Sequence, residues 1–263
     1  MKPGELWVEE AGDGPALLLI QGLGNSGWPA RHQAPLVPGH RVIWLDNRGT
    51  GRSSHDPPPR SIEQLADDAA SVLDGLGVGQ AHVLGHSMGG YITQTLALRR
   101  PELVRSLVLV GTGAGPPGHE PVPAATLESW LQNAHLPPED YARETMHLSF
   151  APGWADANGE LYDRLLAERL EFPTPPTCWR AQFDACVRFV ETGLPIERID
   201  VPTLVVHGDA DRVVPISNGC SIASRVPNAE LVVLSGAGHY PYLEAPELFA
   251  EAVRAFLARV ERK

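Results

Sequence analysis

The chain has only three cysteines, no metal-ligand spacing and no long apolar run. Cys178, Cys186 and Cys220 cannot all pair, and they match no C-x-x-C or zinc pattern. We therefore expect reduced, buried thiols and no metal site. The ten histidines also show no H-E-x-x-H or comparable ligand spacing.

Membrane and nucleic-acid signals are missing as well. No apolar run approaches the ~18 residues needed to span a bilayer, and residues 1–5 lack the basic and apolar regions of a signal peptide. Only 21 basic side chains oppose 32 acidic ones, a formal net charge of −11 that repels phosphate backbones and anionic surfaces. We expect a cytoplasmic protein, a monomer or homodimer, without nucleic-acid partners or membrane insertion.

Short apolar runs alternate with helical patterns along the chain. Such runs are typical of strands buried on both faces, and they occur at 16–20, 41–45, 81–84, 106–110, 203–206 and 230–234. Segment 6–10 predicts an antiparallel edge strand, and 61–76 and 246–260 predict helices. The alternation predicts an α/β fold with a mostly parallel sheet.

The strand rhythm stops between residues 114 and 200, where helical patterns appear around 124–134, 139–149, 160–171 and 179–191. This segment holds three tryptophans and four phenylalanines, which is more aromatic surface than a solvent-exposed insertion needs. Packing among the helices explains part of it, and a lid over an apolar pocket explains the rest. We predict an α/β core from 1–113 and 201–263, with a helical cap at 114–200.

The segment from Gly85 to Gly90, sequence GHSMGG, follows a strand-like run and precedes a helix-like one. That context presents Ser87 on a sharp turn at a helix N-terminus, where glycines allow close backbone approach. A bare G-x-S-x-G pattern is common by chance, and a turn whose serine caps a helix explains most isolated matches. A nucleophilic Ser87 therefore requires partners elsewhere in the chain.

A serine hydroxyl needs a base, and the base needs an orienting group. His239 lies on a glycine-rich loop beyond the last strand run, at the edge where open α/β sheets bind ligands. The acid lies in the turn after the preceding strand run. There Asp209 and Asp211 compete on chemistry alone, because either could simply form the turn.

Acyl transfer also needs donors for the developing oxyanion, and losing one donor costs ~2.7–4 kcal/mol of transition-state stabilisation. The amide of Met88 follows the serine at the helix N-terminus, and the loop Gln21-Gly22-Leu23-Gly24 could bring in the amide of Leu23. An ordinary tight turn would need the same glycines. Both amides are candidate oxyanion-hole donors.

Five motifs in this order resemble those of cap-bearing α/β-hydrolase-fold enzymes, similar to carboxylesterases and enol-lactonases: Gln21 to Gly24, Asp46 to Ser53, Gly85 to Gly90, His207 to Pro215 and Gly238-His239. The resemblance implies a sheet of about eight strands flanked by helices, with a helical cap after the sixth strand. It also makes Asp211 the acid, Asp209 a turn residue and Glu244 a support of the final loop.

Two positions qualify the resemblance. Relatives usually carry histidine where this chain has Gln21, and glutamine keeps donor and acceptor capacity but cannot become charged. Related dehalogenases and epoxide hydrolases use aspartate at the nucleophile position, so Ser87 argues against both activities.

These residues predict a cofactor-free serine hydrolase with Ser87 as nucleophile, His239 as base and Asp211 as orienting acid. We expect it to cleave a small or medium apolar carboxylic ester or lactone through an acyl-enzyme. Four aromatic side chains are the candidate substrate-binding residues: Trp28, Trp130, Trp154 and Trp179.

Two alternatives use the same scaffold. The triad could serve carbon–carbon bond hydrolysis or, with hydrogen peroxide, peracid formation as in cofactor-free haloperoxidases. Carbon–carbon cleavage would need a cationic pocket group, for which Arg169, Arg180 and Arg188 are available. In another class, the scaffold could be a small-molecule receptor or binding module, which an intact triad disfavours.

Overall fold

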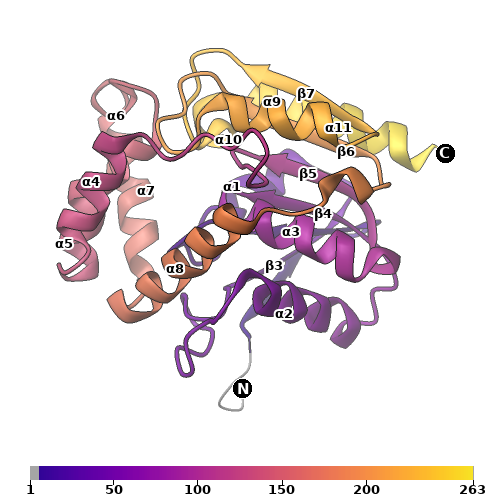
Figure 1. Ribbon diagram of the computed structural model, residues 1–263, viewed down its shortest axis with the longest axis horizontal. Helices are drawn as coiled ribbons and strands as arrows, with labels where there is room; N and C mark the ends of the chain where they lie inside the picture. Colours follow the sequence, from indigo (N-terminus) through magenta and orange to yellow (C-terminus); the bar gives the residue numbers. More distant parts are fainter. Residues whose placement is uncertain (1–5, 263) are drawn as a thin grey trace.

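A computed structural model describes residues 6–262, so the predicted lack of a signal peptide at residues 1–5 lies outside the described residues. One seven-stranded sheet crosses the molecule in the order β1-β3-β2-β4-β5-β6-β7 (Figure 1). Its strands are β1 (Val8–Ala11), β2 (Ala16–Ile20), β3 (Arg41–Leu45), β4 (Ala81–His86), β5 (Val104–Val110), β6 (Thr203–Gly208) and β7 (Ala229–Leu234). Only β1 runs antiparallel to its neighbour.

The strand count differs from the expected eight, and the helical segment follows the fifth strand rather than the sixth. All seven strand-like runs of the sequence form strands, and the eighth was implied only by the resemblance. Ahead of β1, the Trp7 amide donates to the Ser53 hydroxyl and the Trp7 carbonyl accepts from the Asp46 amide. These two bonds tie Trp7 to the residues that follow β3.

Strands β2 to β6 are buried on both faces, as their continuous apolar sequences predicted. The same expectation is wrong for the run at 230–234, because β7 lies at the edge of the sheet and its Val233 is 44% exposed. In β2, Leu18 and Ile20 pack into one core while Leu17 and Leu19 pack into the other. The first core is covered by α2 (Ile62–Gly75), α3 (Met88–Arg99) and α9 (Ile216–Arg225). The second is covered by α1 (Ala30–Gln33) and α11 (Pro246–Glu261), which lies across the sheet from α2 in Figure 1.

Helices fill the segment between β5 and β6. They are α4 (Ala124–Asn133), α5 (Pro138–Thr145), the 3-10 turn η3 (Met146–Ser149), α6 (Trp154–Ala157), α7 (Gly159–Glu171) and α8 (Pro176–Thr192). Helices α4 to α7 gather at one end of the molecule, and α8 returns toward α3 (Figure 1). Tyr91 of α3 stacks on Phe189 of α8 with ring centroids 4.4 Å apart, which anchors the returning helix to the core.

Short elements complete the fold: the 3-10 turns η1 (Ala34–Leu36), η2 (Pro101–Leu103) and η4 (Ile196–Arg198), and the helix α10 (Pro241–Glu244). The expectation of buried thiols is wrong for Cys220, which is exposed, and Cys186 is only partly buried. Cys220 lies two residues from the buried Ile222 on α9, and that spacing points side chains to different sides of a helix. Within residues 6–262, no helix combines the length and apolarity needed to cross a membrane.

Candidate active site

Ser87 stands between β4 and α3 in a strained conformation. Its φ of 56° makes it the one non-glycine residue of the described range, 6–262, with a positive φ. A Cβ on Gly85 would lie 2.4 Å from the Gly89 carbonyl oxygen, and one on Gly89 would lie 2.1 Å from the Ile20 carbonyl oxygen. The glycines are therefore required by close packing, and the turn they allow presents Ser87 at the N-terminus of α3.

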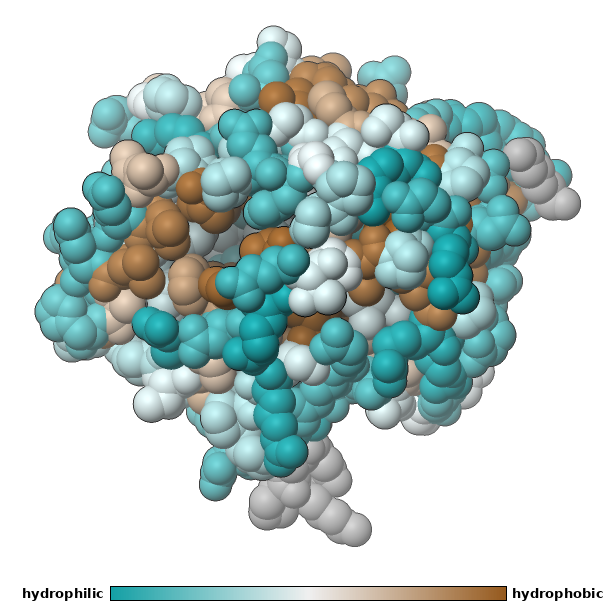
Figure 2. Space-filling view, in the orientation of Figure 1, coloured by the Kyte–Doolittle hydropathy of each residue, from teal (hydrophilic) through white to brown (hydrophobic). Residues whose placement is uncertain are grey.

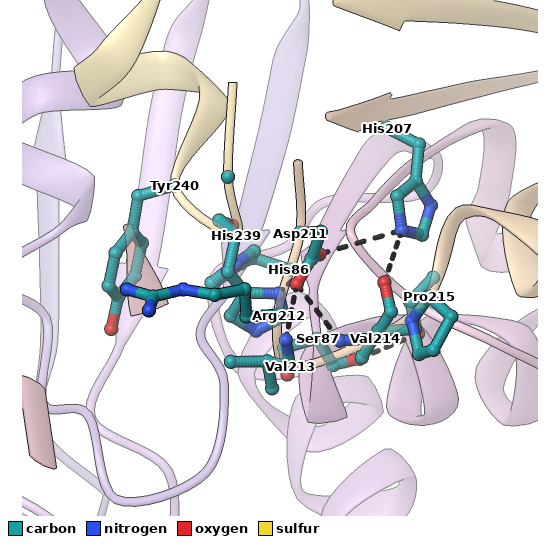
Figure 3. A network of polar contacts seen from close by, with 12 residues as sticks. His86, Ser87, His207, Asp211, Arg212, Val213, Val214, Pro215, His239 and Tyr240 are labelled. Carbon is teal, nitrogen blue, oxygen red and sulfur yellow. Dashed lines mark hydrogen bonds and ion pairs between the residues drawn. The ribbon is translucent and has the colours of Figure 1, made fainter. Parts of the chain in front are cut away.

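His239 and Asp211 meet beside this turn, from the loops after β7 and β6. The Nδ1 atom of His239 donates to the Asp211 Oδ2 at 2.7 Å, while the other carboxylate oxygen accepts from the amides of Val213 at 2.7 Å and Val214 at 2.9 Å (Figure 3). A carboxylate at Nδ1 selects the tautomer whose Nε2 can accept a proton. This is the form that a general base requires.

A second histidine lies on the far side of the Asp211 carboxylate. His207 Nε2 donates to the Val214 carbonyl at 2.8 Å and lies 3.5 Å from Asp211 Oδ2 (Figure 3). Burial by itself raises the pKa of Asp211, but His239, His207 and their hydrogen bonds together hold that pKa well below its ordinary value. The carboxylate is thus ionised in the neutral pH range despite its burial.

Asp209, the competitor for the acid, is exposed and faces away from His239. Its carboxylate accepts from the Gly236 amide at 2.6 Å and the Ser235 hydroxyl at 3.1 Å. Asp209 thereby links the turn after β6 to the turn after β7. Of the two aspartates, Asp211 is the one whose carboxylate contacts His239.

Ser87 and His239 line one pocket together with Leu23. The hydrogen bonds of residues 6–262 do not include one between the Ser87 hydroxyl and His239, a contact that often forms only once substrate is bound. Gly22 lies so close that a Cβ there would come within 3.0 Å of the Ser87 Cβ, which places the Leu23 loop against the turn that carries Ser87. Neither the Leu23 nor the Met88 amide donates to a protein acceptor in the described part of the chain.

Glu244 holds the His239 loop against the helical segment. Its carboxylate accepts from the amides of Ala151 at 2.8 Å and Gly238 at 3.0 Å. Burial raises the pKa of Glu244. The His239 amide also donates to the Ser149 carbonyl at 3.0 Å. The loop that carries His239 is therefore held by Glu244, which follows it in the chain, and by Ser149 of the helical segment.

Gln21 is completely buried, and its side chain faces the core behind the loop. Its Nε2 donates to Gln33 Oε1 at 2.8 Å, and its carbonyl accepts from the Asn47 side chain at 3.0 Å. A neutral amide therefore braces this loop where relatives usually carry histidine. Nearby, the completely buried Asp46 accepts from the Gly27 and Arg52 amides and so fixes the loop that follows β3.

Two pockets meet at Ser87. One, of about 180 Å³, is mostly apolar and runs between α4 and α8, where Figure 2 shows hydrophobic residues around a hollow. We call it the apolar arm; its lining includes Met88, Tyr91, Leu127, Phe183, Val187 and Val190. The other, which we call the polar arm, has about 40 Å³ and is lined by Asn25, Tyr141, Thr145, Ser149, Arg169 and Tyr240 besides Ser87 and His239.

The predicted tryptophans divide between these pockets and the core. Trp130 lines both arms and Trp179 lines the polar arm. Trp28 is buried against Tyr240, with its indole nitrogen donating to Asn25 Oδ1 at 3.3 Å. Trp154 stacks on Phe150. Neither Trp28 nor Trp154 lines a pocket that contains Ser87.

Sequence reasoning missed five residues of the polar arm: Asn25, Tyr141, Thr145, Ser149 and Tyr240. Arg169 was considered only as one of three arginines of the helical segment. Arg180 is exposed and pairs with Asp184, and Arg188 donates to the Arg60 carbonyl on the surface. Tyr240 adjoins His239 in the chain, the one signal that could have drawn attention to it.

Comparison with known proteins identifies the fold family. Residues 15–246 match the family model described as alpha/beta hydrolase fold. A Pseudomonas syringae pv. syringae protein named "Putative carbamate hydrolase RutD" is 33% identical over 250 residues, 94% of this chain and 95% of that protein. A Pseudomonas sp. protein named 2-hydroxy-6-oxononadienedioate/2-hydroxy-6-oxononatrienedioate hydrolase is 29% identical over 97% of this chain and 93% of that protein.

A solved structure gives the same result. Est816, described as an N-acyl homoserine lactone degrading enzyme, superimposes with a TM-score of 0.78 at 28% identity, covering 95% of this chain and 96% of that one. The family model and the relatives span nearly the whole chain, including the turns that carry Ser87, Asp211 and His239. The chain therefore belongs to the alpha/beta hydrolase fold family and is a hydrolase.

Proposed function

We propose that the protein is a serine hydrolase that cleaves a small or medium carboxylic ester or lactone through an acyl-enzyme. The observation that carries the proposal is the 2.7 Å bond between His239 Nδ1 and Asp211, in a pocket that His239 shares with Ser87. An oriented imidazole beside a strained, partly buried serine that lines the same pocket is the arrangement that activates a hydroxyl nucleophile. The proposed cap at 114–200 supplies half of the residues that line this pocket.

The proposed reaction has two halves. His239 Nε2 takes the hydroxyl proton as Ser87 Oγ attacks the carbonyl carbon, and Asp211 stabilises the imidazolium that forms. The oxyanion receives hydrogen bonds from the Leu23 and Met88 amides, which donate to no protein acceptor within residues 6–262. His239 then protonates the leaving alcohol, and water attacks the acyl-enzyme by the same route to release the acid.

The apolar arm supports an acyl group of apolar character. Its lining side chains are almost all hydrophobic, and it opens at Ser87. Burial of alkyl surface there contributes roughly 0.8 kcal/mol per methylene group. Est816, described as degrading N-acyl homoserine lactones, supports this substrate class. The name of the Pseudomonas syringae relative points instead to a carbamate, which the same acyl chemistry could cleave.

Labelling with a fluorophosphonate tests the proposal directly. The wild-type protein should react once, at Ser87, and should hydrolyse p-nitrophenyl esters. Ser87→Ala should lose both reactions while keeping its unfolding midpoint. Ser235→Ala, which changes an exposed serine bonded to Asp209, is the matched control and should retain both. Ester turnover by Ser87→Ala at the wild-type rate would overturn the proposal.

One observation favours a substrate with an acidic group. Arg169 of α7 lines the polar arm, and none of the ion pairs or hydrogen bonds of residues 6–262 involves its guanidinium. Burial raises the pKa of the neighbouring Tyr141 to about 12, so its hydroxyl is a neutral donor. A carboxylate seated here would gain a charge-assisted bond, which suits the dienedioate named for the second relative. Carbon–carbon hydrolysis is therefore our second candidate.

A further inference from the structure

Three potential metal ligands converge at the edge of the sheet opposite Ser87. His40 directly precedes β3, His82 is the second residue of β4, and Glu261 is the last residue of α11. Since Ser87 follows the other end of β4, about 16 Å of strand separates it from His82. The cluster therefore lies apart from the candidate active site.

The three side chains are close enough to share one ion. His40 Nε2 lies 2.9 Å from Glu261 Oε1, His82 Nε2 lies 3.5 Å from the same oxygen, and one ligand atom from each residue lies within 4.8 Å of the other two. Zinc–nitrogen and zinc–oxygen bonds of ~2.0–2.1 Å in a tetrahedron place ligand atoms ~3.3 Å apart. The His40–Glu261 separation of 2.9 Å is shorter than that value, and the His82–Glu261 separation of 3.5 Å is longer.

His82 has a buried nitrogen with no hydrogen-bond partner. The residue is completely buried, and among the described residues its Nε2 makes no hydrogen bond although it faces Glu261. Its other nitrogen, Nδ1, is held by the Ser106 hydroxyl at 2.7 Å. Metal-binding histidines are usually oriented in this way, by a hydrogen bond to the ring nitrogen that does not bind the metal.

Arg105 lies near enough to His82 to add positive charge to the cluster, so a cation there depends on the Glu261 carboxylate. The side chain of Glu261 is 29% exposed, which leaves a path for the ion and a position for water.

We propose that His40, His82 and Glu261 form a binding site for a divalent transition-metal ion of the zinc class. Two imidazoles and one carboxylate suit zinc, cobalt and nickel, whereas calcium and magnesium prefer all-oxygen sites. The bound ion joins the end of α11 to β4 and to the chain entering β3. Its role is structural, because it stabilises the packing of the last helix rather than the reacting atoms.

The experiment uses the full-length protein after dialysis against a chelator. Zinc titration by calorimetry should show one site, cobalt should give the visible absorption of a low-symmetry complex, and zinc should raise the unfolding midpoint by mass action. His40→Gln and Glu261→Gln should each weaken zinc binding by about tenfold or more. Both variants keep a polar side chain, at a buried position for His40 and at a partly exposed one for Glu261, so folding is checked by their unfolding in chelator.

His32→Gln is the matched control, because His32 pairs with Glu168 at 2.6 Å on another surface without a third ligand. It should bind zinc with wild-type affinity. Absence of stoichiometric binding overturns the proposal. So does equal zinc affinity in the wild type, His40→Gln and Glu261→Gln, since the ion would then sit elsewhere.

Discussion

His86 lies directly behind His239 and holds the backbone of its loop. His86 Nε2 donates to the His239 carbonyl at 2.8 Å, and the two ring centroids are 4.6 Å apart. Burial, and then the neighbouring His239, lower the pKa of His86 well below its ordinary value, so the ring is neutral. The residue before Ser87 is thus a brace for the proposed base.

Replacing His86 by Phe should impair catalysis without removing any group that touches substrate. Phenylalanine keeps the ring but leaves the buried His239 carbonyl without its donor, a loss of roughly 1–3 kcal/mol in unfolding free energy. We expect kcat to fall while KM changes little, because the base is displaced and the binding arms are intact. Steady-state kinetics and urea unfolding measure the two effects. A stability loss with wild-type kcat would limit His86 to a structural role.

Asp211→Asn should nearly abolish activity. The amide cannot select the required tautomer of His239 or stabilise its protonated form, and comparable changes lower kcat by roughly 10³- to 10⁴-fold. Asp209→Asn is the control, because asparagine can still accept from the Gly236 amide and the side chain does not reach His239. Its kcat should stay within about tenfold of wild type. Equal losses in the two variants would refute the assignment of Asp211.

The same carboxylate should make stability depend on acid pH. The folded state holds the pKa of Asp211 below its ordinary value of 3.8, so its ionised form stabilises the fold above that value. As pH falls through and below 3.8, this contribution is lost. The difference in unfolding free energy between wild type and Asp211→Asn should therefore be largest near neutral pH and shrink in acid. Urea titrations between about pH 7 and pH 3 check the trend; a difference that grows in acid contradicts it.

The three candidate catalytic residues could be predicted because each follows a strand. Ser87, Asp211 and His239 come after β4, β6 and β7, and the carboxyl ends of parallel strands share one edge of the sheet. Strand patterns alone therefore bring them together. Asp211 could not be separated from Asp209 on chemistry, since both are aspartates of one turn and the sequence does not show which side chain points toward His239.

The pocket lining could not be predicted in the same way. Trp28 lies in a loop without periodicity, so nothing in the sequence shows that it turns toward Tyr240 and the core. The helices of the 114–200 segment were predicted, but which face of α7 carries Arg169 into the polar arm depends on how the helices pack. His40, His82 and Glu261 come from three distant segments, so no local spacing reveals their cluster.

Filling the apolar arm should change chain-length preference. Leu127 of α4 lines this arm, so Leu127→Trp should exclude longer acyl groups while leaving room at Ser87 for acetate. We expect kcat/KM for an octanoate ester to fall by at least about tenfold, with little change for acetate. Leu131→Trp, on the same helix at a position that is 44% exposed and lines neither arm, should leave the preference unchanged. A uniform loss across chain lengths would place the acyl group elsewhere.

Arg169→Met should distinguish the two candidate substrate classes. Methionine fills similar space without the charge, so an ester that carries a free carboxylate would lose a charge-assisted bond of about 1.5–3 kcal/mol. Its kcat/KM should fall by roughly 10- to 100-fold, while a neutral ester of the same length should be hydrolysed at the wild-type rate. Arg164→Met, at an exposed position on the same helix, is the control and should change neither. Equal losses on charged and neutral esters would show that Arg169 supports the pocket wall, and carbon–carbon hydrolysis would then lose the observation that favours it.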